Sequence, residues 1–208
     1  ISSFTPVTST VTFTGASGAG PFSVTSNSQS FYQVVLNAAG KSYRQADAAS
    51  LLGSLTLSAG VWDTNNASAL TVAGSILGAG TLQGLAGGLQ ELISVGANFT
   101  VATYTANATK LLLSGATQPV SVGSYSFYDL EVNKTNTTDV VNATGAWTVT
   151  NSLLLTRGTW NASTFTHSIA GAWNSSAAAF VFNAGTSTIT LSSANPNITT
   201  KGLGTQPF

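Results

Sequence analysis

The sequence contains no cysteine, no methionine, a single histidine and very few charged side chains. Without cysteine the chain can form neither disulfides nor thiolate metal sites. Asp, Glu, Lys and Arg make up only 6% of its 208 residues, compared with roughly 25% in an ordinary soluble protein. Six basic and six acidic residues cancel, so no cationic surface is available to neutralise phosphates. Nucleic-acid binding is therefore not expected.

Long apolar segments are also missing. The nearest candidate, residues 76–95, is interrupted by glycines and by the Gln90-Glu91 pair, whereas a membrane-spanning helix needs about 20 predominantly apolar residues. We therefore expect no membrane span. The apolar share is nevertheless 43%, so a core of ordinary size should lie beneath a surface rich in Ser, Thr, Asn, Ala and Gly. Because the chain begins at Ile1 and lacks methionine, we expect an extracellular protein from which a signal peptide has been removed.

Alternation of apolar and polar residues is the dominant local pattern. It is clearest in residues 8–13, 127–132 and 186–191, where Thr, Val, Ile and aromatic residues favour strands with one buried face. The sequence therefore predicts an all-β protein, and we favour a β-sandwich of short, mostly antiparallel strands. A β-helix is the alternative, because strands near Val11, Val34, Leu55 and Leu70 are spaced by about 15 to 23 residues, a plausible coil length.

An internal repeat becomes visible when the chain is aligned with itself. Residues 31–37 match residues 127–133, and residues 54–62 match residues 152–160, so the copies lie about 96 to 98 residues apart. A third, partial copy starts at residues 186–191 and stops at Phe208, before the Phe-Tyr strand that follows in the earlier copies. This pattern predicts a fold that lacks one strand and therefore has an open sheet edge.

The N-terminal segment is the predicted complement of that edge. In residues 1–14, Val7, Ser9, Val11 and Phe13 share one face of a strand. Residues 15–21 are rich in Gly and form a predicted hinge, and residues 22–208 form the predicted body. We expect the N-terminal strand to leave its own subunit and to pair with the next one.

Catalytic groups are sparse, and no enzyme activity, metal or cofactor is expected. The only histidine, His167, is interpreted as a solvated strand residue, and no nucleophile motif surrounds a serine. Asp129 and Glu131 are two residues apart and could bind a hard cation together, but two exposed charges are the favoured interpretation. No pair typical of a glycosidase stands out among the acids, which are Asp47, Asp63, Glu91, Asp129, Glu131 and Asp139. Because so few acids titrate, stability should change little between neutral and strongly acidic pH.

Two further residue classes have structural interpretations. The four tryptophans, together with Tyr32 and Tyr128, are interpreted as core residues or turn anchors rather than as a sugar-binding face. The four lysines are few enough for each to be considered as one end of an isopeptide bond to an asparagine, although this interpretation is not favoured. These lysines are Lys41, Lys110, Lys134 and Lys201.

Asn-x-Ser/Thr sequons are the one abundant motif. With 15 asparagines and Ser plus Thr near 28% of residues, about four sequons are expected by chance, and nine occur. They are Asn66, Asn98, Asn107, Asn133, Asn136, Asn142, Asn161, Asn174 and Asn197. N-linked glycans at such sites would hydrate a surface that has little charge.

Taken together, these features resemble the subunits of archaeal surface filaments called threads, which are similar to bacterial type 1 pilins. The resemblance rests on the charge-poor Thr/Ser/Asn-rich composition, the sequons, the alternating N-terminal strand and the missing strand. It implies a donor-strand-complemented β-sandwich that polymerises head to tail into a cell-surface filament for adhesion or biofilm formation. The alternative function is a monomeric β-helical adhesin or glycan-binding module.

The sequon excess leads to a direct prediction about the native protein. Several acceptors, especially Asn66, Asn107, Asn136 and Asn161, should carry sugars, because the surface otherwise lacks strongly hydrated groups. Intact mass spectrometry of material from the natural source should give a mass well above the 21.0 kDa of the bare chain. A mass equal to that of the bare chain would contradict the prediction.

Overall fold

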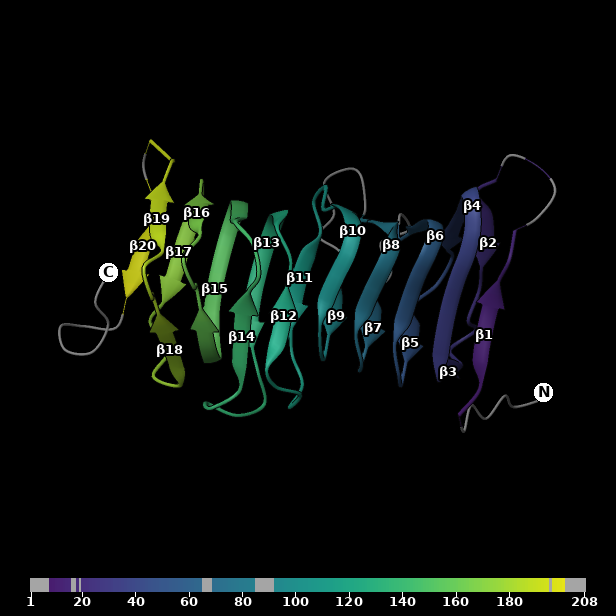
Figure 1. Cartoon of the computed structure of the whole chain (residues 1–208), viewed down its shortest axis with the longest axis horizontal. Coiled ribbons are helices and arrows are strands. Elements are labelled where there is room, and N and C mark those ends of the chain that lie inside the picture. Colours follow the sequence, from purple (N-terminus) through teal and green to yellow (C-terminus); the bar gives the residue numbers. More distant parts are fainter. Residues whose placement is uncertain are drawn as a thin grey trace.

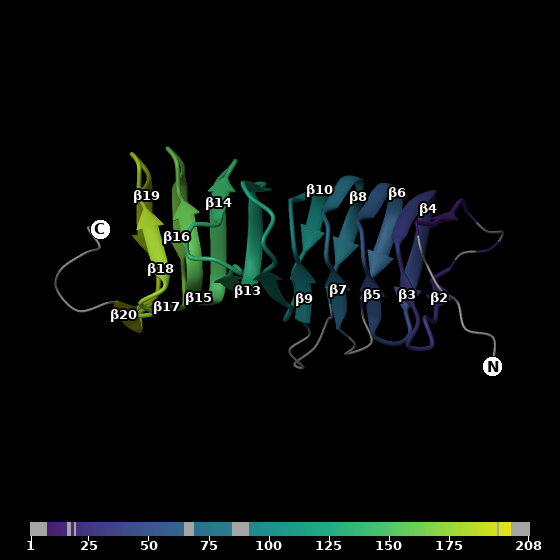
Figure 2. The same cartoon turned by 90° about the horizontal axis from the view of Figure 1, so that it is seen from below.

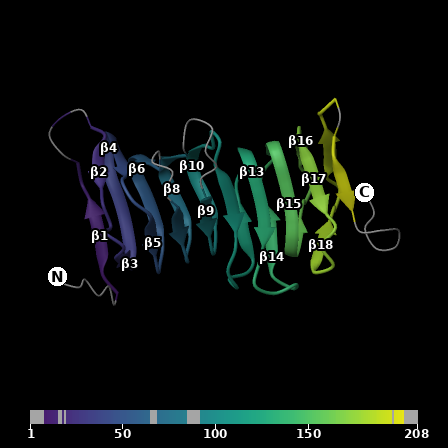
Figure 3. The ribbon, with the colours of Figure 1, turned by 180° about the vertical axis from the view of Figure 1, so that it is seen from behind.

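The protein is a parallel β-solenoid, in which the chain winds through successive turns along one long axis (Figure 1). The computed structural model describes residues 8–15, 18, 20–64, 69–84, 92–194 and 196–200. In these residues every pairing between strands is parallel, and none of them forms a helix. Figure 2 shows the same stack of strands from below, and Figure 3 shows it from behind.

Each turn contributes one segment to each of three faces, and the segments of a face form a continuous or nearly continuous ladder. The first face contains β1 (Thr10–Phe13), β12 (Val120–Val122), β14 (Val140–Ala143), β18 (Phe180–Asn183) and parts of the long strands β4 (Gln33–Gln45), β6 (Leu55–Asp63), β8 (Ile76–Gln83), β10 (Phe99–Thr105) and β15 (Trp147–Asn161). These segments represent nine turns within the described part of the chain.

The strands β4, β6, β8 and β10 bend at a corner and continue on the second face. That face contains β2 (Phe22–Val24), the second parts of β4, β6, β8 and β10, the first parts of β13 (Tyr125–Asn133) and β15, then β16 (Thr166–Ile169) and β19 (Thr188–Leu191). The third face contains β3 (Ser30–Phe31), β5 (Ala49–Leu51), β7 (Leu70–Val72), β9 (Leu92–Val95), β11 (Lys110–Leu113), parts of β13 and β15, then β17 (Ala172–Ser175) and β20 (Ile198–Thr200).

Inward side chains stack in columns because strands of successive turns pair in register. Val34, Leu55, Ile76 and Phe99 are successive partners on the first face, and each is fully buried. Burial of an aliphatic side chain of this size contributes about 1.5–3 kcal/mol. Trp62, Trp147, Trp160 and Trp173 are buried as well, which confirms their interpretation as core residues. The rings of Trp147 and Trp160 stack with centroids 4.9 Å apart.

The preference for an antiparallel sandwich was wrong, and the β-helix alternative describes the fold. Period-two alternation shows only that one face of a strand is buried, and this holds in both architectures. The direction of pairing depends instead on the path of the chain between strands. Here partners such as Val34 and Leu55, or Leu55 and Ile76, lie one turn apart and run in the same direction.

The N-terminal strand lies within the solenoid of its own chain. Thr10–Phe13 pairs in parallel with Gln33–Leu36 of β4, and Val11 and Phe13 pack against the core. Ser9 is exposed, whereas Val7 and part of the predicted hinge lie outside the described residues. In the single chain, therefore, this strand does not project as an arm. Donation of the strand between chains stays a prediction.

The internal repeat does not match whole turns of the solenoid. Leu55–Leu57 lies on the first face, but its counterpart Leu153–Leu155 lies on the third. Likewise Trp62 lies on the second face and its counterpart Trp160 on the first. Each repeated segment therefore lies on a different face of the solenoid in the two copies. The repeat corresponds to strands that meet at a corner, and not to a whole number of turns.

Two Ala-Gly pairs, Ala73-Gly74 and Ala170-Gly171, lie at corners where the chain approaches the preceding turn. A Cβ atom at Gly74 would lie 2.7 Å from the Gly53 carbonyl oxygen, and one at Gly171 would overlap the Asn151 carbonyl oxygen. Neither position can accommodate a side chain. Glycine is therefore required at these corners by close packing of neighbouring turns.

This packing predicts a large effect of one methyl group. Gly171→Ala should lower the free energy of unfolding by about 1–3 kcal/mol, because the new Cβ forces the β16–β17 corner away from Asn151. Ala146→Ser, at an exposed position, serves as the control and should leave stability nearly unchanged. Urea unfolding followed by circular dichroism measures both. Equal midpoints for Gly171→Ala and the wild type would disprove the packing argument.

Candidate functional site

One of the three ladders is interrupted between the fifth and sixth turns. On the second face, Thr103–Thr105 of β10 pairs with β8, and Tyr125–Phe127 of β13 pairs with β15. No ladder joins these two segments, which are both described, although they belong to successive turns (Figure 2). The first and third faces remain connected there, through Phe99 with Val122 and through Lys110 with Asp129. We call this interruption the notch.

Aromatic rings fill the interior behind the notch. Phe99 packs edge-to-face against Tyr104 and Tyr125, with centroids 5.1 and 5.0 Å away, and Tyr104 lies 5.9 Å from Phe127. The Tyr125 hydroxyl donates a 2.6 Å hydrogen bond to the Val101 carbonyl oxygen. Burial raises the pKa of Tyr125 to about 12, so the hydroxyl keeps its proton. The rings thus connect the two turns where the backbone ladder does not.

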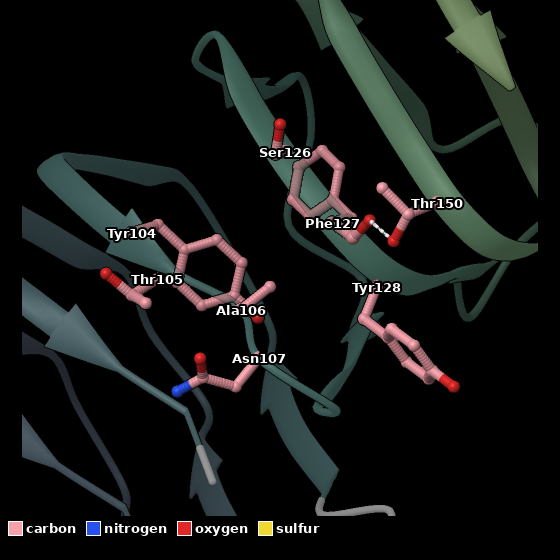
Figure 4. Close-up of a pocket in the computed structure, with 8 residues that line it drawn as sticks. All are labelled: Tyr104, Thr105, Ala106, Asn107, Ser126, Phe127, Tyr128 and Thr150. Atoms are coloured by element: carbon pink, nitrogen blue, oxygen red, sulfur yellow. Dashed lines mark hydrogen bonds between the residues drawn. The ribbon is translucent and has the colours of Figure 1, made fainter. Parts of the chain in front are cut away.

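Outside these rings the notch contains a cavity of about 310 Å³ (Figure 4). Its aromatic lining comes from Tyr104, Phe127 and Tyr128, and its polar lining comes from Thr105, Asn107, Ser126 and Thr150. Asn107 donates to the Gly84 carbonyl oxygen at 2.7 Å, and Thr150 donates to the Phe127 carbonyl oxygen at 3.2 Å. No lining residue is charged.

A second polar group lies on the third face, next to the notch. Lys110 forms an ion pair with Glu131, and Asn151 donates a 2.8 Å hydrogen bond to Asp129. Both carboxylates are largely buried, so the interpretation as exposed charges was wrong. A cation site is not favoured either, because the Glu131 carboxylate already pairs with the Lys110 ammonium group. The described residues contain no group of three metal-ligating side chains.

The other described acids and lysines also have structural partners. Asp47 accepts hydrogen bonds from the backbone of Ser26 and Asn27, Asp63 pairs with Arg44, and Asp139 accepts from Asn136. Glu91 lies outside the described residues. Among the five acids that the structure describes, no two form a glycosidase pair of facing, accessible carboxylates.

Among the lysines, Lys134 is buried and donates to the carbonyl oxygens of Gly96 and Ser114 on two preceding turns. Burial lowers its pKa. Lys41 donates to the Gly18 carbonyl oxygen at 2.6 Å, and Lys201 lies outside the described residues. The contacts of the three described lysines are therefore with backbone or carboxylate oxygens, which does not favour an isopeptide bond to an asparagine.

The sequons differ in accessibility. Exposed acceptors are Asn107, Asn133, Asn136 and Asn197; half-buried ones are Asn98, Asn142, Asn161 and Asn174; Asn66 lies outside the described residues. All four half-buried ones have side-chain hydrogen bonds: Asn161 donates to Asn142 at 3.1 Å, Asn98 accepts from the Ser121 backbone at 2.8 Å, and Asn174 accepts from the Ser176 backbone at 3.1 Å. Hydrogen bonding does not separate the two groups, because the amides of Asn107, Asn133 and Asn136 also donate. Exposure therefore favours the exposed group as glycan acceptors over the half-buried group, which includes Asn161.

Comparisons with known proteins add no identification. The chain matches no protein-family model, no curated protein and no solved structure. Among the described residues, no helix is long and apolar enough to cross a membrane.

His167 faces the core, contrary to the interpretation as a solvated residue. Its Nδ1 accepts a hydrogen bond from the Trp147 backbone at 3.1 Å, and its Nε2 lies 3.0 Å from the Ala162 carbonyl oxygen. These partners fit a neutral ring with its proton on Nε2. The signal was present in the sequence, because His167 has the same strand parity as Phe165 and Ile169.

The burial of His167 predicts sensitivity to acid, contrary to the small effect of pH expected from the few acids alone. Burial lowers the pKa of His167 below its usual 6.5, so its contribution to stability is present above that value and is lost as the pH falls through the folded-state pKa. A proton on Nδ1 would also face the Trp147 N–H. We expect the urea midpoint to fall between pH 7.5 and pH 4.5, and to fall less in His167→Gln. Identical pH profiles for the two proteins would contradict this assignment.

Proposed function

We propose that the chain is a rigid β-solenoid rod of an extracellular surface protein that supports adhesion. The observation that carries this proposal is an uncharged row of hydroxyl side chains on the outer surface of the second face. Ser126, Thr148, Ser168 and Thr190 are register partners on β13, β15, β16 and β19. Neighbouring hydroxyls in such a row follow the strand spacing of about 4.8 Å.

The distribution of charge supports the same proposal. Asp63 and Glu131 pair with Arg44 and Lys110, which leaves the outer surface mainly to Ser, Thr and Asn. A surface of this kind is poorly suited to ionic steering of a charged substrate. It is well suited to hydration by hydroxyls and by glycans on exposed acceptors such as Asn107 and Asn136. Because each turn contacts mainly its neighbours, the fold can act as a spacer.

A filament subunit that polymerises head to tail is the second candidate. One observation favours it: within the described residues β1 pairs only with β4, so its other edge remains available to a strand from another copy. This mode differs from donation of residues 1–14, because β1 stays in its own chain. Such pairing would extend the first-face ladder into a neighbouring subunit.

Solution scattering separates the two candidates. The rod proposal predicts a mass of 21.0 kDa for the bare chain at all concentrations, and an elongated particle whose described turns account for about 43 Å at about 4.8 Å each. Light scattering gives the mass, and small-angle X-ray scattering gives the shape. Growth into long polymers would overturn the monomeric rod. Loss of those polymers on removal of residues 1–14 would establish the filament candidate instead.

A further inference from the structure

The notch differs from every other position on the second face, where a strand of the next turn covers its neighbour. Figure 4 shows Tyr104 and Asn107 on one side of the cavity, and Phe127, Tyr128 and Thr150 on the other. The lining comes from three successive turns, because Thr150 lies one turn beyond Phe127. The ring centroids of Tyr104 and Phe127 are 5.9 Å apart and connect the first two of these turns. The cavity is thus built on rigid strands and closed from behind by packed rings.

The lining defines the chemistry of a ligand. Aromatic rings present a negative face to weakly positive C–H groups. The hydroxyls of Thr105 and Ser126 can each donate and accept hydrogen bonds, and the Thr150 hydroxyl, which donates to Phe127, can still accept one. No lining side chain carries a charge, so a charged ligand would lose hydration without gaining a partner. A molecule with C–H faces and many neutral hydroxyls fits this lining.

We propose that the notch binds one or two residues of a neutral saccharide. The cavity of about 310 Å³ lies at the lower end of the range of about 300–1,000 Å³ for small-molecule sites, which limits the bound portion to that size. Tyr128, which is half-buried, supplies the stacking surface, and Thr105 and Ser126 supply hydrogen bonds at the mouth. This inference rests on the proposed adhesive role, for which it names a site and a ligand class.

Two sources could supply the saccharide. One is a glycan of another molecule, and the other is a glycan of this chain attached to Asn107, which lines the cavity and begins the sequon Asn107-Ala108-Thr109. Asn107 is exposed and lies in a turn with φ of 49°. A sugar attached there would begin at the mouth of the notch and compete with any free saccharide.

The test uses the whole chain from a host without N-glycosylation. Probes are glucose, galactose, mannose, N-acetylglucosamine, cellobiose, maltose and lactose, with glucuronate and glucosamine as charged controls. Binding is measured by saturation-transfer NMR and calorimetry. We expect at least one neutral probe to bind and the charged ones to bind at least tenfold more weakly. Failure of all neutral probes, or equal binding of the charged ones, would overturn the proposal.

Matched variants locate the site. Tyr128→Ala should weaken binding about tenfold, equivalent to about 1.4 kcal/mol, whereas Tyr32→Ala should not change it. Tyr32 is the repeat counterpart of Tyr128 and is also half-buried, but it lies far from the notch. Thr105→Val should weaken binding several-fold, and Thr103→Val, an exposed residue outside the lining, should not. Equal losses in the paired variants would place the binding elsewhere.

Native glycosylated protein distinguishes the sources. If the Asn107 glycan fills the notch, added saccharide should bind only after enzymatic removal of N-glycans. If the ligand comes from another molecule, native and deglycosylated protein should bind alike. The scattering experiment tests the rod separately, so a monomeric rod without saccharide binding would reject the notch assignment alone. Polymers that still bind saccharide would reject the monomeric rod alone.

Discussion

The parallel ladder along the solenoid axis is the constraint on which the rest of the structure depends. Each turn satisfies its backbone hydrogen bonds with the turns before and after it, so every residue is held at a fixed height above its partner. Inward positions must therefore pack against similar residues, as Val34, Leu55 and Ile76 do. Corners must bring the backbones of neighbouring turns close together, which explains why Gly74 and Gly171 leave no room for a Cβ.

Polar side chains can be buried inside the stack only where fixed groups of the protein are their hydrogen-bond partners. Lys134 uses its ammonium group to bind carbonyl oxygens of two earlier turns, and His167 accepts from one backbone group while its other nitrogen lies beside a carbonyl oxygen. An unpaired polar group at these depths would cost free energy. The partners of Lys134 and the Trp147 partner of His167 are backbone groups of other turns, so the burial of both side chains depends on the stacking of turns.

The notch shows what happens when one ladder stops while the other two continue. The short strand β12 leads almost directly into Tyr125, and the rings of Phe99, Tyr104, Tyr125 and Phe127 occupy the interior at this point. The stack remains connected through side chains, but the outer surface is left with a cavity. A local loss of backbone pairing thereby creates a lining in which aromatic and hydroxyl groups meet.

The sequence by itself determined the class of structure and the chemistry of the surface. Period-two alternation indicated strands without helices, and the composition indicated a core of ordinary size under an uncharged surface. The buried tryptophans were also predictable, because large apolar rings in strands are rarely left in water. Parity could have placed His167 in the core, since it alternates with Phe165 and Ile169.

Only the tertiary structure decided the direction of strand pairing, the partners of the buried charges and the existence of the notch. Alternation reports which side of a strand is buried and carries no information about its neighbour. Residues such as Lys110 and Glu131, or Tyr104 and Phe127, meet because one turn places residues about 20 positions apart at the same corner. That distance depends on the path of the whole turn, which varies from one turn to the next.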